Sequence, residues 1–556
     1  MSFEAIRKDC SALLGYFHSP AGKIKIPALL RVKGNLLVGE TTEGKNFELR
    51  MPDVVFGSPE GYFPAPLSFE NVEEPWKVVG DWIVVIDWKK LVDFRGFKEE
   101  FCFFPRGLQL YQHPRMFVEA ILEIRKAIGF GKLLYVPGIA LPSRLAVLAS
   151  LRIDVFDDAL ARFLGEKGVL TLPEGLLQCE EKTGDENFSL LEQELKVVER
   201  FACLGRLREL VEMRVRAEPE LVALLRYMDL LNYQFFEKLW PVSGEKFYAN
   251  SKESLHRVDV VRYRERLKGY RGVNASLLLL VPCSAKKPYH SSRSHMKIEE
   301  VLVNTGVRPN IHVVSLTSPL GVVPEELENF YPANAYDIPV TGHWDMEEKG
   351  VVIEGLKGFV GNYRHVLAYL PQDYNFVVEH FGLENACTAE VTSEESLEVL
   401  ARRIDELNLG VGNPKKRLQE DVKNALQFQF QGIDTGFLEE ARIKGKRWDW
   451  SIWLGDEAFR MQEEQGKILV LREGGKILAS QGIKCVEIRD FEIKGDIFVP
   501  GIISASEDIR AGDEVVIVQN SMPVGTGTAV LSGIEMVELR KGLAVKMRER
   551  WKQEQK

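Results

Sequence analysis

The sequence lacks any apolar run long enough to cross a bilayer. Its most apolar stretch, residues 275–282, is about eight residues long, whereas a membrane-spanning helix needs roughly twenty. The first ten residues mix charges of both signs and contain no apolar segment followed by a small-residue cleavage site. We therefore expect a cytoplasmic protein with no membrane partner.

Close cysteine pairs are also missing. The sequence has seven cysteines, at positions 10, 102, 179, 203, 283, 387 and 485, with no CxxC spacing. An odd number of scattered cysteines argues against a disulfide framework and against a structural zinc site. Any cysteine with a role in function is expected to act as a free thiol.

An excess of positive charge is absent from the chain as a whole. Its 556 residues include 72 Lys and Arg against 81 Asp and Glu, and 45% hydrophobic with 28% charged residues is ordinary globular composition. This length has room for three or four domains. The formal net charge of −9 would, as an average, repel a phosphate backbone.

The cations that are present gather in four segments. Residues 284–297 and 441–447 each carry four cations and no acid, 252–272 carry seven cations against three acids, and 540–556 carry seven against two. Positive charge confined to a track, with negative charge elsewhere, favours a specific polyanion over indiscriminate binding. The pattern predicts RNA binding that weakens steeply with salt.

The N-terminal region, residues 1–245, alternates short β-rich runs with helical periodicity. A strand-like run at 82–87 precedes a helical pattern at 115–126 and a second strand-like run at 133–137. About 250 residues of this βα repetition suit a (β/α)8 barrel better than a short open sheet.

A second α/β domain is predicted for residues 246–430, opening on a charged helical stretch at 252–268. Its strands are expected at 276–281, 312–315 and 366–370, each followed by a loop with Pro or Ser. Because ligands of open α/β sheets bind beyond the carboxyl ends of the strands, we expect the functional site in these three loops. The overall fold class is therefore multidomain α/β.

The remaining residues divide into a connection and a tail. The Trp-rich segment 431–479 is predicted to be a connecting region. From residue 480 to 556, short strands broken by glycine turns predict a small β-barrel.

The loop after the first of these strands concentrates the side chains that covalent catalysis uses. Residues 282–295 contain one thiol, two histidines, a phenol, four hydroxyls and three cations, but no carboxylate. Cys283 is the predicted nucleophile, because Lys286, Lys287 and a nearby helix N-terminus would stabilise its thiolate. His295 could return across the loop as acid or base, whereas His290 is not among the predicted catalytic residues. A packing role for Cys283 and a solvated lysine pair are the plainer alternatives.

The tail resembles a PUA domain. The features that fit are the order and spacing of Gly501, residues 512–515, Gly525, Gly533 and Gly542. Since PUA domains bind RNA, the resemblance implies a structured RNA partner. With the basic character of 540–556, it implies RNA-binding roles for Gly512, Asp513, Lys541, Lys546, Arg548 and Arg550.

The loop and the segments after it resemble the archaeosine synthase family, which is related to tRNA-guanine transglycosylases. The pattern is Pro-Cys, three residues, Lys-Pro-Tyr, two residues, Ser, two residues, His; its matches are Pro282, Cys283, Lys287, Pro288, Tyr289, Ser292 and His295. Further matches lie at 315–321, 324–327, 331–332, 336–337 and 341–344. The resemblance covers essentially the whole chain.

This resemblance implies that an amine adds to the nitrile of 7-cyano-7-deazaguanine in the D-arm of tRNA. A thiolate would attack the nitrile carbon to give a thioimidate, and the amine would displace the thiol to leave an amidine. Cys283 would be the nucleophile and His295 the proton donor, while Lys287 and Tyr289 would stabilise developing negative charge or hold the base. The implied substrate-binding residues are Ser292, Lys286, Asp337 and His343.

The implied amine is free L-lysine, and a radical-SAM partner enzyme would then cleave the adduct. This chain has no CxxxCxxC motif to hold an iron–sulfur cluster itself. A homodimer is left open.

The N-terminal region resembles a transglycosylase barrel that has lost its reaction. Residues 136–142 and 153–158 correspond to segments of that family, with Asp157 at the position of its nucleophilic carboxylate. The CxCxxC zinc motif is reduced to Cys179, so we expect no zinc, no other cofactor and no base exchange. Two alternatives stay open: an active tRNA-guanine transglycosylase, and a non-catalytic tRNA-binding subunit.

Overall fold

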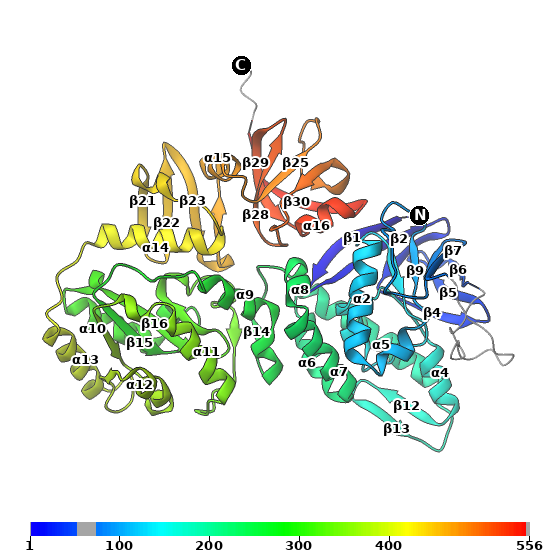
Figure 1. The fold of residues 1–556 in the computed structure, drawn as a ribbon, viewed down its shortest axis with the longest axis horizontal. Coiled ribbons are helices and arrows are strands. Elements are labelled where there is room, and N and C mark those ends of the chain that lie inside the picture. The colour runs from blue at the N-terminus through cyan, green and yellow to red at the C-terminus, as the bar shows by residue number, and fades with distance from the viewer. Residues whose placement is uncertain (1, 53–73, 552–556) are drawn as a thin grey trace. The chain divides into compact units, whose positions relative to one another are not determined.

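A computed structural model describes residues 2–52 and 74–551 of the chain (Figure 1). The chain divides into two units, the first made of residues 1–241, 486–512 and 528–547 and the second of residues 242–485, 513–527 and 548–556. The cations Lys552 and Lys556 of the basic tail lie outside the described residues. No helix among the described residues is long and apolar enough to cross a bilayer.

The first unit contains a sheet with a parallel centre. Five neighbouring strands run parallel: β4 (Ala28–Lys33), β11 (Val155–Asp157), β10 (Leu133–Tyr135), β9 (Phe101–Phe103) and β8 (Trp82–Val85). Antiparallel strands flank them, namely β5 (Leu36–Glu40) and β6 (Asn46–Arg50) at one edge and β7 (Trp76–Val79) at the other.

This topology confirms the predicted α/β class, but the described residues do not form the closed ring of eight parallel strands of a complete (β/α)8 barrel. The reason is local: Gly34 and Gly80 adopt positive φ angles in tight turns, and tight turns join strands antiparallel. A parallel crossover needs a dozen residues or more.

Helices and three further strand pairs complete the first unit. Its helices are α1 (Gly107–Tyr111), α2 (Pro114–Ile128), α3 (Leu145–Ser150), α4 (Ala159–Glu166), α5 (Gly184–Cys203), α6 (Leu207–Arg214), α7 (Pro219–Arg226) and α8 (Tyr233–Leu239). The N-terminal strands β1 (Ser2–Asp9), β2 (Ala12–Ser19) and β3 (Gly22–Ile26) pair antiparallel, as do β12 (Val169–Leu172) and β13 (Gly175–Gln178).

The second unit is built on a five-stranded sheet in the order β17, β16, β15, β19, β20. Strands β15 (Leu277–Pro282), β16 (Ile311–Thr317), β19 (His365–Ala368) and β20 (Glu384–Asn385) are parallel, and β17 (Gly321–Pro324) is antiparallel to β16. The three predicted strands of this domain are thereby confirmed, with ends displaced by one to a few residues. Strand β15 is apolar at every position and buried on both sides, as expected for the centre of a parallel sheet.

Helices cover both faces of this sheet. Alternate residues of β15 divide between two cores: Leu278 and Leu280 face one, Leu277 and Leu279 the other. The first core includes residues from α9 (Val258–Leu267), α11 (Met346–Lys357), α12 (Asn375–Phe381) and α14 (Pro414–Gln429); the second includes residues from α10 (Arg293–Asn304) and α13 (Glu394–Glu406). The result is a three-layer α/β/α domain.

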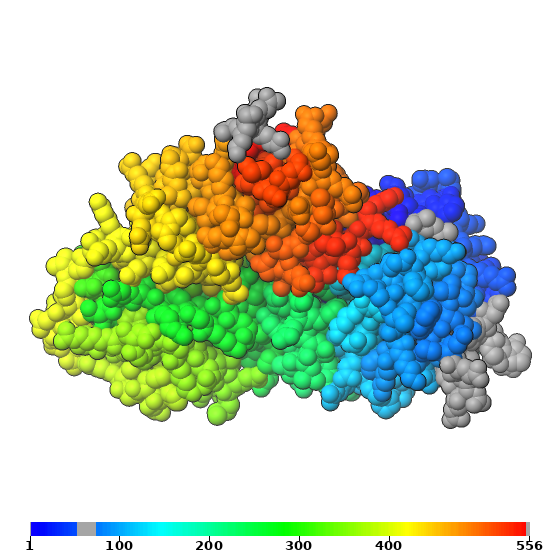
Figure 2. Space-filling view, turned by 45° about the horizontal axis from the view of Figure 1, so that its top comes forward, coloured from blue at the N-terminus to red at the C-terminus, as the bar shows by residue number. Residues whose placement is uncertain are grey.

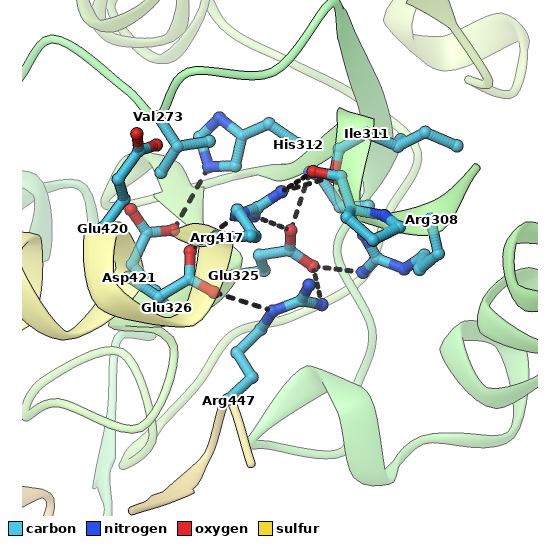
Figure 3. A network of polar contacts seen from close by, with 12 residues as sticks. Val273, Arg308, Ile311, His312, Glu325, Glu326, Arg417, Glu420, Asp421 and Arg447 are labelled. Atoms are coloured by element: carbon cyan, nitrogen blue, oxygen red, sulfur yellow. Dashed lines mark hydrogen bonds and ion pairs between the residues drawn. The ribbon is translucent and has the colours of Figure 1, made fainter. Parts of the chain in front are cut away.

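A buried ionic network stabilises this domain near the amino-terminal half of β16 (Figure 3). The carboxylate of Glu325 accepts hydrogen bonds from Arg308, Arg417 and Arg447, and Asp421 accepts from the latter pair of arginines. These arginines hold the pKa of Glu325 well below its usual range despite the opposing effect of burial. The matched segment 324–327 is thus part of the structural framework.

The Trp-rich segment is not merely a connection, as predicted, but a folded sheet. Its four antiparallel strands, in sequence order, are β21 (Arg442–Lys446), β22 (Asp449–Leu454), β23 (Asp456–Gln462) and β24 (Lys467–Val470). Alternate residues such as Trp450, Ile452 and Phe459 are buried in the core of the second unit. Helix α15 (Arg472–Ser480) follows β24.

The C-terminal tail is rich in short strands, as predicted. It contains β25 (Cys485–Ile488), β26 (Ile497–Phe498), β27 (Ile502–Ala505), β28 (Glu514–Gln519), β29 (Met522–Ala529), α16 (Gly533–Glu538) and β30 (Lys541–Arg550). Within the first unit β25 pairs with β27, and β30 pairs with both β26 and β1.

Candidate functional site

The candidate site lies where the connections of two neighbouring parallel strands leave the sheet on opposite faces. Strand β15 is followed by α10, which packs on one face, and its neighbour β19 is followed by α12, which packs on the other. Such a topological switch point opens a crevice at the carboxyl ends of the strands.

Cys283 stands at this position, directly after the last residue of β15. Its backbone N–H donates to the carbonyl of Leu316 at 3.0 Å, which fixes the residue against β16, and the side chain is half-buried. The loop after β19 brings Tyr374 to it, with 3.6 Å between the Sγ of Cys283 and the phenol oxygen. Burial raises the pKa of Tyr374 above its ordinary value, so its phenol stays protonated near neutral pH.

A cavity of about 350 Å³ opens beside the thiol. All three predicted loops contribute to it: residues 283–285 and Lys287 after β15, Ser318 after β16, and Pro371, Asp373 and Tyr374 after β19. The segment 337–344 forms another wall. The motifs at 282–295, 315–321, 336–337 and 341–344, which are far apart in the sequence, therefore meet at one cavity.

Lys287 is the cation inside this cavity. It is half-buried, and its Nζ lies 4.2 Å from the ring centre of Tyr336. Burial lowers the pKa of Lys287, an effect partly opposed by the negative charges of Cys283 and Asp337. Lys287 and Cys283 line the same cavity, so the ammonium can favour a thiolate or an anion that forms there.

Three carboxylates line the same cavity. Asp337 forms an ion pair with Lys246 at 3.0 Å, and Glu348 accepts a hydrogen bond from Ser318 at 2.7 Å. Asp373 is exposed at the rim. A cluster of acids beside a half-buried thiol suits a positively charged co-substrate.

Tyr289 lies beneath the cavity rather than in its wall. It is fully buried, and its hydroxyl shares a hydrogen bond of 2.5 Å with that of Tyr336, which also contacts the hydroxyl of Thr317 at 2.5 Å. Burial raises the pKa of Tyr289 well above its ordinary value. This hydroxyl network supports the ring of Tyr336, over which Lys287 lies.

His295 and Ser292 also face away from the cavity. The Nε2–H of His295 donates to the carbonyl of Pro282 at 3.0 Å, and the imidazole stacks on the ring of Tyr289. Burial lowers the pKa of His295 to about 4, so the ring is neutral at physiological pH. Ser292 is the N-cap of α10 and accepts from the backbone N–H of His295. Both side chains therefore stabilise the conformation of the loop 282–295 through hydrogen bonds to its backbone.

The remaining predicted residues of this loop region lie at or beyond the rim. His343 is exposed and lines the cavity, whereas Lys286 is exposed and does not. Sequence reasoning missed Tyr374, Glu348 and Asp373. Asp373 and Tyr374 lie in the loop after 366–370, one of the three loops in which we expected the site. No local sequence pattern distinguished these two residues from their neighbours.

The predicted RNA-binding residues of the tail fall into two groups. Lys541, Lys546 and Arg550 are exposed. Asp513 is buried and paired with Lys484 at 2.9 Å, and Arg548 bonds the buried carboxylate of Glu514. Gly512 has a φ of +93° and donates to the carbonyl of Ala529, so it is a turn residue. Asp513 and Arg548 are occupied by ion pairs of the fold itself.

Asp157 in the first unit is buried, and its carboxylate is hydrogen-bonded to neighbouring groups of the protein. It is 1% exposed, and it accepts hydrogen bonds from the hydroxyl of Tyr135 and from the backbone N–H groups of Gly138 and Ala159. Burial raises its pKa to about 6. No group of three or more His, Cys, Asp or Glu side chains suited to a metal occurs among residues 2–52 and 74–551.

Comparisons with known proteins bear on both the site and the tail. A family model described as a domain of unknown function (DUF5591) matches residues 260–404, which include the candidate nucleophile, and the PUA domain model matches residues 487–550. The archaeosine synthase subunit alpha of Thermoplasma acidophilum is 32% identical over 448 residues, covering 80% of this chain and 87% of the relative.

Two further relatives extend this picture. The archaeosine synthase of Haloferax volcanii is 33% identical over 479 residues, which cover 78% of this chain and 80% of the relative. The tRNA-guanine(15) transglycosylase of Methanocaldococcus jannaschii is 24% identical over 485 residues, which cover 77% of this chain and 67% of the relative.

Proposed function

Because the chain belongs to the archaeosine synthase family, we propose that it modifies tRNA in archaeosine biosynthesis and that its reacting group is the thiol of Cys283. The observation that carries the proposal is the position of this thiol at a topological switch point, beside a cavity that also holds a protonated phenol, an ammonium and carboxylates. The substrate would be tRNA that carries 7-cyano-7-deazaguanine.

In the first step the Cys283 thiolate attacks the nitrile carbon. The S–C bond forms while one C–N π bond breaks, and the nitrogen takes up a proton to give a thioimidate. Tyr374 is the proposed proton donor because its hydroxyl lies 3.6 Å from the sulfur and stays protonated. Lys287 would stabilise the charge on the nitrogen. His295, neutral and bonded to Pro282, is a positioning residue in this scheme.

In the second step an amine attacks the thioimidate carbon. The C–S bond breaks, the thiolate leaves, and an amidine remains on the base. The resemblance to the family points to free L-lysine as the amine. The carboxylates of Asp337, Glu348 and Asp373 support this choice, since they would bind an ammonium group and could accept the proton that the attacking amine must lose.

The other parts of the chain would bind the RNA. The PUA match and the exposed Lys541 and Lys546 support tRNA binding by the tail. We propose that the first unit is a degenerate transglycosylase-like barrel, with a ring of strands that is incomplete, retained as a scaffold, since Asp157 is enclosed by Tyr135 and the backbone of Gly138. A separate radical-SAM enzyme would process the lysine adduct.

The experiment is incubation of the purified chain with cyano-deazaguanine tRNA and labelled L-lysine, followed by nucleoside mass spectrometry. Wild type should label the tRNA and Cys283→Ala should not. Cys387→Ala is the matched control, because Cys387 is half-buried in the same unit but does not line the cavity. Full labelling by Cys283→Ala would refute the thioimidate.

The two alternatives predict other outcomes. If the chain is incubated with the free base and with tRNA that carries labelled guanine, release of that guanine would indicate an active transglycosylase. Binding of tRNA with no change in any nucleoside, by wild type and Cys283→Ala alike, would indicate a non-catalytic subunit.

A further inference from the structure

The outer face of the four-stranded sheet β21–β24 carries an unusual set of side chains. In β21 the cations Arg442, Lys444 and Lys446 occupy alternate positions, so all three point to the face opposite the buried Trp450 and Ile452. All three are exposed. Within the part of the chain that the structure describes, none of the three forms an ion pair. The region that contains β21 and β22, in yellow, lies at the surface visible in Figure 2.

Neighbouring strands add an aromatic ring and a further cation to this face. Trp453 pairs with Arg442 across the strands, and the Nζ of Lys444 lies 3.4 Å from the ring centre of Trp453. Arg460 of β23 follows on the same face, opposite Ser451. We call Arg442, Lys444, Lys446, Trp453 and Arg460 the β21 surface.

Protection of a sheet edge does not account for the β21 surface. Charged residues, lysine above all, are commonly placed on edge strands to prevent pairing with other chains, and β21 is an edge strand. That role needs charges on the edge strand alone, yet the surface continues across β22 and β23 through Trp453 and Arg460. Two acids lie beside it: Glu457 pairs with Arg460, and Asp449 lies opposite Lys446.

The tip of the β21–β22 hairpin is fixed to the loop that holds the thiol. The indole of Trp448 stacks on the imidazole of His290, with ring centres 4.0 Å apart and planes within 11°. Its Nε1–H donates to the carbonyl of Glu325, and Asn329 donates to the carbonyl of Trp448. His290 lies in the turn Tyr289–Ser291 of the Cys283 loop, where Glu328 binds its Nδ1 at 2.5 Å.

Arg447 anchors the same tip to the buried network of Figure 3. It donates to Glu325 at 2.7 Å and to Asp421 at 3.3 Å. The hairpin therefore keeps a fixed position relative to the Cys283 loop within the second unit. A ligand bound to the β21 surface would therefore lie at a fixed position relative to the thiol of Cys283.

We propose that the β21 surface binds the phosphate backbone of the RNA substrate and that the Trp448–His290 stack aligns this contact with Cys283. The proposal rests on the proposed function for the identity of the RNA. Cations on alternate strand positions are about 7 Å apart, so they can follow successive phosphates of one strand. Trp453 offers a ring on which a base or sugar can stack.

An RNA fits the β21 surface better than an acidic protein. The central part of a protein–protein interface is depleted in charge and enriched in apolar contacts, whereas here the cations lie in the middle and the single large ring is covered by Lys444. Sugar–phosphate contacts are made mainly by Lys and Arg in such rows.

The test compares two triple variants in equilibrium binding of tRNA at several salt concentrations. The first is Arg442→Gln, Lys444→Gln, Lys446→Gln. The matched control is Lys357→Gln, Arg403→Gln, Lys476→Gln, which removes the same charge from surface helix residues that pair with a Glu three positions away and lie outside the four basic segments. The β21 variant should bind at least tenfold more weakly near physiological salt.

The salt dependence identifies the nature of the contact. Each lost phosphate contact reduces the slope of log K against log salt by about 0.7 to 0.9, so three contacts should reduce it by about 2 to 3. Unchanged affinity and slope relative to the control variant would overturn the proposal. An acidic protein that co-purifies on wild type and is lost from the β21 variant, without any change in tRNA binding, would overturn it equally.

A pair of single variants tests the alignment. Trp448→Ala should lower the rate of modification at saturating tRNA while changing affinity less than threefold. Trp453→Ala should weaken binding and leave the saturated rate unchanged. Equal effects of the two variants on both quantities would refute the role of the stack.

Failure of this proposal and failure of the proposed function can be told apart. If the β21 variant binds normally while wild type still modifies tRNA, the proposal on the β21 surface alone is wrong. If wild type binds tRNA through this surface but alters no nucleoside, the β21 surface stands and the proposed reaction fails.

Discussion

The buried imidazole of His295 provides a quantitative test of the geometry of the loop. Its Nε2–H donates to Pro282, its ring stacks on Tyr289, and burial lowers its pKa from 6.5 to about 4. In the unfolded chain the same histidine has its ordinary pKa. Between pH 6.5 and 4 the unfolded chain therefore binds a proton that the folded chain does not.

The sign and size of the effect follow from this difference. Since the unfolded state binds more protons in this window, the free energy of unfolding falls as the pH falls. Each pKa unit corresponds to about 1.4 kcal/mol, so the full loss is about 3 kcal/mol at low pH, of which about 2 kcal/mol appears between pH 7 and pH 5. The contribution of His295 to stability is complete above pH 6.5.

The assay is urea unfolding of wild type and His295→Gln at pH 7 and pH 5, followed by the exchange of backbone amides of β15 and α10. The Gln side chain can still donate to Pro282 but does not titrate. Wild type should lose about 2 kcal/mol more than the variant between the two pH values. His380→Gln, at an exposed position of the same unit, is the matched control.

Equal pH dependence of wild type and His295→Gln would refute this description of the loop. It would mean that the imidazole is solvated or charged in the folded protein, and a proton-donor role for His295 would regain support. The modification rate should likewise show no titration of His295 around neutral pH.

Three other predictions concern the site and its framework. Tyr374→Phe should lower the modification rate about 100-fold while the fold is kept, because it removes a hydroxyl 3.6 Å from the sulfur; an unchanged rate at saturating substrate would exclude it as proton donor. Burial lowers the pKa of Lys287, so activity should decrease as the pH rises, with the midpoint of this alkaline limb below pH 10.5. In a pH–rate profile, Lys287→Arg should shift the alkaline limb to higher pH. Arg417→Met should cost about 3 to 5 kcal/mol in urea unfolding, because it leaves the buried Glu325 and Asp421 short of a partner; a loss below 1 kcal/mol would contradict the network in Figure 3.

Local patterns in the sequence were sufficient for the three central strands of the second α/β domain and for the region of the site, but not for the sheet formed by residues 442–470. The apolar run at 276–281 has the length and composition of a strand buried on both faces, which the structure confirms, and the loop after it carries the thiol. The same reasoning located the strands at 312–315 and 366–370 and hence all three loops of the cavity.

The partners of the thiol could not be predicted in the same way. Tyr374 is 91 residues from Cys283, and their contact depends on β19 pairing directly with β15 while the helices after them leave on opposite faces. His295, twelve residues from Cys283, was the nearer candidate by sequence. The N-cap at Ser292 sets the first turn of α10, which directs the imidazole to the carbonyl of Pro282 instead.

The sequence by itself determined the parallel strands of the second α/β domain, where the thiol and the cations are, and which family the chain resembles, because each of these depends on short-range spacing. Only the tertiary structure decided which groups meet: the phenol and carboxylates with Cys283, and the basic strand 442–446 with the loop through Trp448 and His290. Strand order and the face on which each helix packs are set by the burial of the whole core, and no local pattern contains that information.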